Sequence, residues 1–381
     1  MSFQLNKEQK MIQKTAREFA RKVLAVTAAE RDVSHEYPAG NLKKMGELGF
    51  LGLLVSEKYG GTAVGTIAYS LALSEIAYSC ASTAVIMSVH SSICCNSIEK
   101  FGTEEQKKEF LEPMAAGDFI GAFALTEPEA GSDPRSMSCF AEKRGDNFII
   151  NGVKRFITTG KNSGVIILLA KTGDDEISAF LITHDLPGFE VGRIEDKMGQ
   201  CASDTTDLLF NDCVVPASRI LGKKGEGFKI AMSGLDAGRI GIASVSLGIA
   251  EAALEETISY VKQRKQFGKK ISDFQGIRWM LADMAIDVQA AKHFVMNAAT
   301  VKERGEYCTA DAAMAKCFAS EMVQRVTGQA IQLHGGYGYI KEYPVERFYR
   351  DARITTIYEG TNQIQRIIIA NELLKDKKNN H

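Results

Sequence analysis

The sequence predicts a mainly α-helical protein with a β-domain in its middle. Residues 1–120 carry apolar side chains at helical spacing, whereas residues 121–225 contain short β-branched runs separated by Gly, Asn and Asp. Residues 226–381 show long helical patterns, and no proline occurs from 217 to 343. Because 381 residues exceed what one core usually serves, we expect three domains with these boundaries.

The N-terminal zone is expected to be helical throughout. Asn6 can cap a first helix, with Gln9 three positions further on completing a capping box. The stretch "GNLKKMGELGFLGLLV" predicts a helix that leads into a glycine-punctuated turn. Residues 66–102 are nearly uncharged, which predicts a pair of helices that is buried almost all round.

The middle zone is expected to form a small antiparallel β-domain. Its candidate strands are "DNFIINGVKRFITTG", "GVIILLAKTG", "SAFLITHD", "FEVGRI" and "TDLLFNDCVV". The segments after this zone, beginning with "GFKIAMSGLDAGRIGIASVSLGIAEAALEETISYVKQRKQF", predict a bundle of long helices with charged outer faces.

Charge and composition exclude several classes of protein. A formal net charge of −1 argues against nucleic acid as the main partner. The sequence contains no uninterrupted apolar run of membrane-spanning length, so we do not expect it to insert into a membrane. The N-terminus lacks the apolar core of a signal peptide. Eight cysteines without a C-x-x-C pair predict buried thiols in a reducing compartment rather than disulfides. We therefore expect a bacterial cytoplasmic protein or, for a processed eukaryotic chain, a mitochondrial matrix protein.

The common catalytic and nucleotide-binding signatures are missing from this sequence. The stretch "GEGFKI" has Ile230 at the third fingerprint position and no βαβ pattern around it, which argues against a nicotinamide site. No G-x-S-x-G, H-E-x-x-H or phosphate-loop motif occurs, and the histidines show no metal-ligand spacing. No metal site is therefore expected, and His334, which lies beside glycines, is expected to be structural.

Four other segments together suit a large planar cofactor with a phosphate tail. They are "FALTEPEAGSD", "RFITTG", "QRKQFGKKISDFQ" and "QLHGGYGY". Phe156 can stack on a ring, and Thr126 and Thr158 can form hydrogen bonds with ring heteroatoms. Arg264 can pair with a phosphate group.

One carboxylate near the C-terminus is unusually placed. In "TTIYEGTNQI", Glu359 lies between an aromatic run and Gly360, which interrupts a helical pattern. Taken alone, Glu359 is either an acid at a helix N-terminus or a general base.

In this order, the motifs "LTEPEAGSD", "RFITTG", "LDAGRIGIA", "QRKQFGK" and "GGYGYIKEYPVERFYRDARITTIYEGTNQIQR" resemble the acyl-CoA dehydrogenase family over essentially the whole chain. The resemblance implies an N-terminal helical domain, a middle β-barrel or sandwich and a C-terminal four-helix bundle. It also implies an FAD-containing homotetramer, arranged as a dimer of dimers, that oxidises an acyl-CoA thioester between its α and β carbons. Electrons would pass to electron-transfer flavoprotein.

The resemblance further assigns roles to individual residues. Glu359 matches the base that removes the α-proton while the β-hydride passes to flavin N5, with the carbonyl held by the Glu359 N–H and a flavin ribityl hydroxyl. Cofactor contacts are implied for Phe123, Leu125, Thr126, Ser132, Phe156, Ile157, Thr158, Arg264, Gln266, Phe267, Gln275, Gln332, Gly335, Gly336, Thr361 and Gln363. Substrate contacts are implied for Ser132, Asp236, Arg239, Tyr358 and Gly360.

The same resemblance narrows the type of enzyme. One branch of the family places its base on the helix of an L-D-x-E-R segment, but here that segment reads "LDAGR" and Gly238 stands at the position. This implies a short- or medium-chain type with the base at Glu359. A decarboxylating glutaryl enzyme is disfavoured, because no Lys or Arg occurs from 59 to 99. Two alternatives stay open, a flavin oxidase or monooxygenase of the same fold and a non-catalytic helical adaptor.

Overall fold

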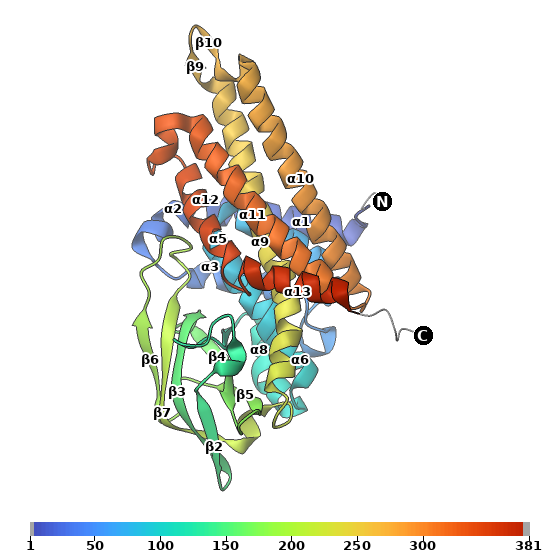
Figure 1. Cartoon of the computed structure of the whole chain (residues 1–381), viewed down its shortest axis with the longest axis vertical. Helices are drawn as coiled ribbons and strands as arrows, with labels where there is room; N and C mark the ends of the chain where they lie inside the picture. The colour runs from blue at the N-terminus through green and yellow to red at the C-terminus, as the bar shows by residue number, and fades with distance from the viewer. Residues whose placement is uncertain (1–3, 376–381) are drawn as a thin grey trace. The chain divides into compact units, whose positions relative to one another are not determined.

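The computed structural model describes residues 4–375, which fall into two compact units. We call Met1–Ala29, Thr66–Ala81 and Arg239–His381 the bundle unit, and Glu30–Gly65 and Ser82–Gly238 the sheet unit (Figure 1). Each unit combines segments that are far apart in the sequence. The three domains expected from the sequence follow chain order instead, and their boundaries stay a prediction.

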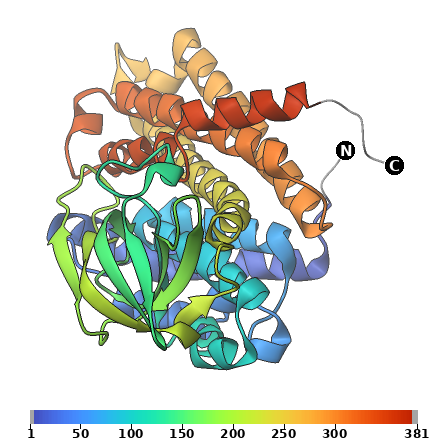
Figure 2. The same ribbon diagram turned by 60° about the horizontal axis from the view of Figure 1, so that its bottom comes forward.

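The sheet unit contains one eight-stranded sheet with the strand order β6-β7-β3-β2-β4-β5-β8, and β1 pairs with β4 beside this path. Figure 2 shows these strands side by side. The strands are β1 (Ile120–Ala124), β2 (Phe140–Arg144), β3 (Asn147–Thr158), β4 (Ser163–Lys171), β5 (Ile177–Ile182), β6 (Phe189–Ile194), β7 (Thr205–Pro216) and β8 (Ile220–Leu221).

The sheet is mostly but not wholly antiparallel, which refines the sequence prediction. Strand β1 runs parallel to β4, and β2 meets β4 in parallel at Phe140 and Lys171. The pairs β2–β3, β3–β7, β4–β5, β5–β8 and β6–β7 are antiparallel. Strand β1 was not predicted, because "IGAFA" is short and Ile120 is its only β-branched residue.

Strand β4 explains why "GVIILLA" contains no polar residue. Its alternate residues Val165, Ile167 and Leu169 pack into one core cluster with the helical residues of this unit. The residues between them, including Ile166 and Leu168, pack into a second cluster with Phe148, Phe180 and Phe210. A strand that is buried on both faces has no position for a solvated side chain.

Short helices complete the sheet unit. Its helical elements are α3 (Ala39–Glu47), η2 (Phe50–Gly52), η3 (Glu57–Tyr59), α5 (Ala81–Ser88), η4 (Val89–Cys95), α6 (Asn96–Phe101), α7 (Glu104–Gln106), η5 (Lys107–Leu111), α8 (Glu112–Ala116), η6 (Pro134–Ser136) and η7 (Ala217–Arg219). As the uncharged sequence predicts, every residue from 80 to 95 is buried.

The bundle unit is helical. It contains α1 (Lys7–Phe19), η1 (Ala20–Leu24), the first part of α2 (Ala25–Ser34), α4 (Gly65–Ser79), the later part of α9 (Gly227–Gln263), the hairpin strands β9 (Lys265–Gln266) and β10 (Lys269–Lys270), η8 (Ile271–Asp273), α10 (Gln275–Glu303), α11 (Thr309–His334), η9 (Gly335–Tyr339), α12 (Val345–Arg353), η10 (Ile354–Thr356) and α13 (Asn362–Leu374). Figure 1 shows α10 and α11 running alongside each other. The predicted capping box at Asn6 and Gln9 is confirmed.

Helix α9 is long and apolar enough to cross a membrane by composition alone, but 89% of its most apolar window is buried, as in the core helix of a soluble protein. Within residues 4–375, all eight cysteines are buried thiols, as the sequence predicts. The same part of the chain holds no cluster of His, Cys, Asp or Glu that is placed to bind a metal ion. The expected cellular compartment stays a prediction.

Candidate functional site

Glu359 lies in the short loop between η10 and α13, and this loop has an unusual backbone. Glu359 itself has a φ of 54° and Gly360 has a φ of 86°, so two successive residues occupy the left-handed region. For a residue with a side chain, this conformation is strained and persists only where the surroundings enforce it. The bend expected at Gly360 thus begins one residue earlier, at the acid.

The carboxyl group of Glu359 is held in an environment that favours its neutral form. Within residues 4–375, its Oε2 atom is buried and has no hydrogen-bond partner. Burial raises the pKa of Glu359 to about 7, although the positive charges of Arg239 and Lys316 act to lower it. A carboxyl group with a pKa near neutrality can accept a proton efficiently at working pH.

A network of buried polar residues on α11 and α13 holds this loop in place. The Lys316 ammonium on α11 donates to the Gly360 carbonyl at 2.8 Å and to Asn362 Oδ1 at 2.9 Å. Gln365 Nε2 donates to the carbonyls of Glu359 and Gly360, at 3.1 and 2.9 Å. Ser320 and Asn362 also bond to each other, and no described residue accepts a hydrogen bond from the Glu359 N–H. The loop therefore keeps one backbone donor available beside the acid.

Replacing Gly360 with Ala should disturb this loop. A Cβ at Gly360 would lie 2.7 Å from Gln365 Nε2, and the positive φ of 86° disfavours any side chain. We expect G360A to lower kcat at least tenfold while bound flavin is retained, because the bonds of Gln365 that orient the loop must shift. Steady-state assays and flavin absorbance would check this. As a control, alanine at the exposed Gly40, where a Cβ meets nothing within 4 Å, should behave like the wild type.

The substrate residues expected near the base lie in different settings. Arg239 on α9 is buried, and its charge reaches Glu359 within the bundle unit. Tyr358 precedes the base and is half-buried, with its N–H bonded to the Ile354 carbonyl. Asp236, three residues before Arg239 on the same helix, is half-buried and belongs to the sheet unit. The link between Arg239 and the base was not anticipated from the sequence.

The sheet unit brings "LTEPEAGSD" and "RFITTG" together. The Arg155 N–H donates to the Thr126 carbonyl at 2.8 Å, which joins the two motifs directly. Phe156 has a φ of 58°, and its ring is 56% exposed. Thr126 and Thr158 are half-buried. An exposed aromatic ring beside two threonines is the arrangement that the sequence suggested for a planar ring system.

Other members of the predicted flavin set have different surroundings. The Ile157 side chain is buried in the sheet core, so only its backbone is available for a cofactor. Phe123 and Leu125 are half-buried against the other core cluster, while Ser132 is exposed. The expected roles of these residues stay predictions.

A buried ion pair locks the two motifs of the sheet unit. Lys154 Nζ lies 2.7 Å from Glu127 Oε1, with side-chain exposures of 0% and 2%. Lys154 also donates to the Leu125 carbonyl at 3.0 Å. Glu127 accepts bonds from the Ser138 N–H and hydroxyl and from the Cys139 N–H. Burial alone would raise the pKa of Glu127, but Lys154 and Ser138 outweigh it and hold the pKa below its ordinary value.

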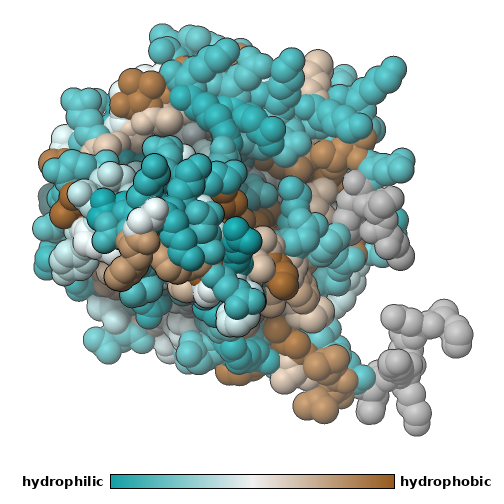
Figure 3. Space-filling view, turned by 90° about the horizontal axis from the view of Figure 1, so that it is seen from above, coloured by the Kyte–Doolittle hydropathy of each residue, from teal (hydrophilic) through white to brown (hydrophobic). Residues whose placement is uncertain are grey.

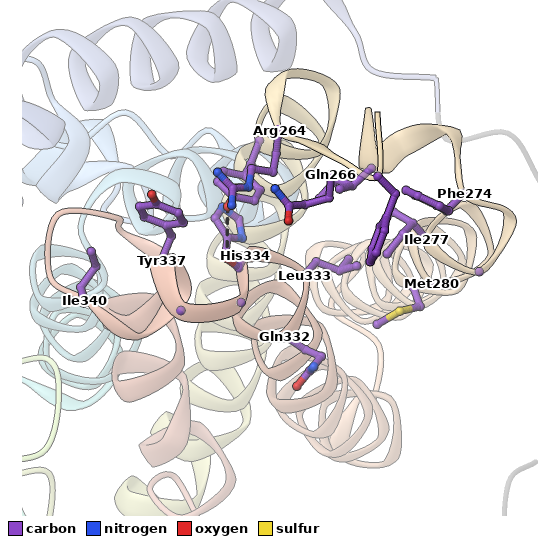
Figure 4. Close-up of a pocket in the computed structure, with 16 residues that line it drawn as sticks. Arg264, Gln266, Phe274, Ile277, Met280, Gln332, Leu333, His334, Tyr337 and Ile340 are labelled. Atoms are coloured by element: carbon purple, nitrogen blue, oxygen red, sulfur yellow. Dashed lines mark hydrogen bonds between the residues drawn. The ribbon is translucent and has the colours of Figure 1, made fainter. Parts of the chain in front are cut away.

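The bundle unit contains a pocket of about 890 Å³ beside the β9–β10 hairpin (Figure 4). It gathers Arg264, Gln266, Phe267, Gln332, Gly335 and Gly336, all of which the sequence analysis assigned to the cofactor. Gln275 does not line the pocket, although its neighbours Phe274 and Gly276 do. The guanidinium of Arg264 lies 5.2 Å from the centre of the Tyr337 ring, and Phe274, Ile277 and Met280 form an apolar wall.

His334 lines the same pocket but serves the fold. Its ring stacks on Tyr260 with centroids 4.2 Å apart, and its Nδ1 lies 2.8 Å from the Ala330 carbonyl. Tyr260 in turn donates to the His334 carbonyl at 3.2 Å. Burial lowers the pKa of His334, so the ring is neutral near pH 7. The expectation that His334 is structural agrees with these contacts.

A second pocket, of about 440 Å³, adjoins the Glu359 loop and contains Thr361 and Gln363 in its lining. Thr361 also caps α13, because its hydroxyl accepts a hydrogen bond from the Ile364 N–H at 3.4 Å. This hydroxyl can still donate to a ligand. Thr361 thus combines a structural task with the cofactor contact that the sequence analysis expects.

The arrangement within each unit fits the parts of FAD. The 890 Å³ pocket offers a cation for phosphate, aromatic rings for adenine, and open space above Gly335 and Gly336, where a Cβ would meet nothing within 4 Å. In the sheet unit, Phe156 and two threonines suit the flavin ring.

Sequence reasoning missed three residues that support the site. Lys316, Lys154 and Glu127 are all nearly inaccessible to solvent, although charged residues are rarely buried without a partner. The available signal was their setting, since Lys316 is the lone charge in the stretch "AAMAKCFAS" and Lys154 belongs to a strand. Identifying their partners required the structure, because these lie 27 and 44 residues away in the sequence.

The comparisons with known proteins show the family of the chain. Residues 6–118, 122–213 and 225–374 match the N-terminal, middle and C-terminal domains of acyl-CoA dehydrogenase. The chain is 45% identical to the short-chain specific acyl-CoA dehydrogenase of Clostridium acetobutylicum, over 98% of this chain and 100% of that protein.

Two solved structures are also similar. Butyryl-CoA dehydrogenase from Megasphaera elsdenii has a TM-score of 0.96 and 45% identity, covering 98% of this chain and 100% of that one. A chain from a study of the electron transferring flavoprotein of Acidaminococcus fermentans has a TM-score of 0.97 and 47% identity, covering 99% and 100%. The chain therefore belongs to the acyl-CoA dehydrogenase family of flavoprotein oxidoreductases.

Proposed function

We propose that this chain converts a short- to medium-chain acyl-CoA, with a straight or branched acyl group, to the trans-2-enoyl-CoA, with Glu359 as the base. One observation carries the proposal. Glu359 Oε2 is buried without a partner, the pKa of the carboxyl is raised to about 7, and the residue lies in a loop whose own N–H is available. A carboxyl group that only capped a helix would instead accept hydrogen bonds from backbone N–H groups and have a lowered pKa.

The proposed task of Glu359 follows from the chemistry of the substrate. A C–H bond beside a thioester is a very weak acid, and it becomes removable when donors hold the carbonyl oxygen as negative charge develops. The Glu359 N–H is one such donor, and the left-handed backbone of the loop keeps it out of α13. The same residue thus supplies a proton acceptor through its side chain and a hydrogen-bond donor through its backbone.

FAD, when bound, supplies the acceptor for the β-hydride. Arg264, Gln266 and Phe267 would hold its phosphate and adenine part together with Gln332, Gly335 and Gly336. Phe156 and Thr158 would contact its ring, and Thr361 and Gln363 its adenosine half. Arg239 and Asp236 would anchor the CoA part of the substrate, and Tyr358 would line the acyl pocket. These assignments combine the family resemblance with the pockets described above.

We also propose a homotetramer that passes electrons to electron-transfer flavoprotein. Large apolar side chains are exposed on the bundle unit, including Phe267 at 92% and Tyr339 at 85%. On the face drawn in Figure 3, apolar residues form separate patches within a mostly hydrophilic surface. Exposed aromatic residues are typical of an interface with another copy. Analytical ultracentrifugation would measure the number of subunits.

A substrate panel tests the proposed function. Straight-chain thioesters from butyryl- to palmitoyl-CoA, together with isobutyryl-, 2-methylbutyryl- and glutaryl-CoA, would be assayed with an artificial electron acceptor. We expect the highest kcat/KM on a short or medium chain and no decarboxylation of glutaryl-CoA. Stoichiometric hydrogen peroxide without an added acceptor would favour an oxidase. A colourless purified protein with no flavin absorbance would favour an adaptor.

A further inference from the structure

We propose that Lys316 positions Glu359, fixing the backbone of the loop that carries the acid and placing a positive charge behind its carboxylate. This inference rests on the proposed function of Glu359 as the base. The Lys316 side chain is 0% exposed, so a substrate cannot reach it. It therefore acts through Glu359 rather than on a substrate.

The hydrogen bonds of Lys316 fix the loop just after the base, at the carbonyl of Gly360. Its ammonium group is 0% exposed and bonds to the Gly360 carbonyl and to the Asn362 side chain, the first residue of α13. Any tilt of the 360–361 peptide, to which the Gly360 carbonyl belongs, would break this bond. Because Glu359 and Gly360 both have left-handed backbones, this bond helps to hold a conformation that would otherwise relax.

Hydrogen bonding alone does not account for a lysine at this position. Gln365 Nε2 already donates to the same Gly360 carbonyl at 2.9 Å, so a neutral donor is present. A buried ammonium group is costly to desolvate, and burial lowers the pKa of Lys316 to about 8. What the lysine adds to the network is its charge, which acts on Glu359 and favours the carboxylate form.

The other charges around this pair leave Lys316 a distinct role. Arg239 on α9 also favours the Glu359 carboxylate, and it acts against the charged form of Lys316. Glu321 on α11 favours the Lys316 cation, but it is itself ion-paired with Arg366 on α13 at 2.7 Å. Cys317 also favours the Lys316 cation. Lys316 combines its charge with a hydrogen bond to the backbone of the base loop, at the Gly360 carbonyl.

The test compares Lys316→Met and Lys316→Gln with the wild type in the FAD-loaded enzyme. Both variants remove the charge, and Gln keeps an amide donor for the Gly360 carbonyl. Removing a cation makes the carboxylate less favourable, so the pKa of Glu359 must rise. We expect the acidic limb of the pH profile of kcat/KM to move to higher pH in both variants. A shift of half a pH unit to one pH unit would lower kcat/KM roughly threefold to tenfold at pH values on the acidic limb. On the plateau at higher pH, kcat/KM should stay nearer to the wild-type value.

Lys292→Met is the matched control, because it removes the same charge from a pair with Glu251 on the bundle unit. Its acidic limb should coincide with that of the wild type. Lower activity of the Lys316 variants at every pH, with an unmoved limb, would show a merely structural role and overturn the proposal. If Lys316→Met does not fold, Lys316→Gln carries the comparison.

A second readout does not depend on turnover. A group whose pKa is raised by folding stabilises the fold relative to its neutral variant at low pH, and this advantage is lost as pH rises through the raised pKa. The melting temperature of the wild type relative to Glu359→Gln should therefore fall as pH rises to about 7 and stay constant above that pH. In the Lys316→Gln background the change should extend to higher pH, and an identical pH range would overturn the proposal.

These measurements separate the two claims. Near wild-type turnover of Glu359→Gln would overturn the proposed base, and with it the role of Lys316. Strong loss in Glu359→Gln, combined with Lys316 variants whose acidic limb stays in place, would overturn only the inference about Lys316.

Discussion

Replacing Glu359 with Gln is expected to lower kcat at least about a hundredfold, because an amide cannot accept the α-proton. Glutamine has nearly the same size and keeps the backbone N–H that would hold the thioester oxygen. Bound flavin and substrate affinity should therefore stay close to those of the wild type. Stopped-flow reduction of the flavin by butyryl-CoA would measure the chemical step, and the flavin spectrum would report cofactor content.

Glu372→Gln is the matched control for this variant. It makes the same change, from a carboxyl group to an amide, at a residue away from the Glu359 loop. Glu372 lies at the end of α13, where it pairs with Lys375. Its turnover should equal that of the wild type. Retention of near wild-type turnover by Glu359→Gln would contradict the assignment of the base.

The second large effect is expected on stability. Replacing Lys154 with Met leaves Glu127 as a buried carboxylate without its cation, and breaking such a pair typically costs about 3–5 kcal/mol. Urea unfolding followed by circular dichroism would measure the loss. Loss of bound flavin should accompany it, because Lys154 joins the two motifs that we propose to hold the flavin ring. Adding Glu127→Gln should recover part of the stability, since this removes the buried charge.

The pH dependence of this effect has a definite sign. The pKa of Glu127 is lowered in the folded protein, so the pair contributes stability above the unfolded pKa of roughly 4.3, and this contribution is lost as pH falls further. The gap between wild type and Lys154→Met should thus be full at neutral pH and shrink under acid. Lys143→Met, at an exposed position on β2, should change stability by less than about 0.5 kcal/mol. An equal loss in both variants would contradict the role of the buried pair.

Periodicity and caps made much of the fold predictable. The capping box at Asn6, the buried helices of residues 66–102 and the apolar strand β4 follow from local pattern, because each is fixed by residues close in sequence. The parallel pairing of β1 with β4 does not, since strand direction depends on the path of the chain between them. The partners of Lys154 and Lys316 could not be predicted either, because they also depend on the path of the chain.

In the candidate site, too, some features could be predicted from the sequence and others required the structure. Motif order and the glycine at position 238 were enough to predict Glu359 as the base. The left-handed backbone of Glu359 could not be read from sequence, because the bend was expected at Gly360, where glycine makes it easy. The side chain of Ile157 turned into the core, since strand alternation sends neighbouring residues to opposite faces.

The most direct test of the central claim measures proton removal alone. An acyl-CoA analogue with sulfur in place of the β-carbon keeps its α-protons but has no β-hydride to give. Incubated with the FAD-loaded enzyme in D₂O, it should take up deuterium at the α-carbon, as followed by proton NMR. We predict rapid exchange with the wild type and exchange at the uncatalysed rate with Glu359→Gln. Equal exchange with both proteins would contradict the account, because another group would then be removing the α-proton.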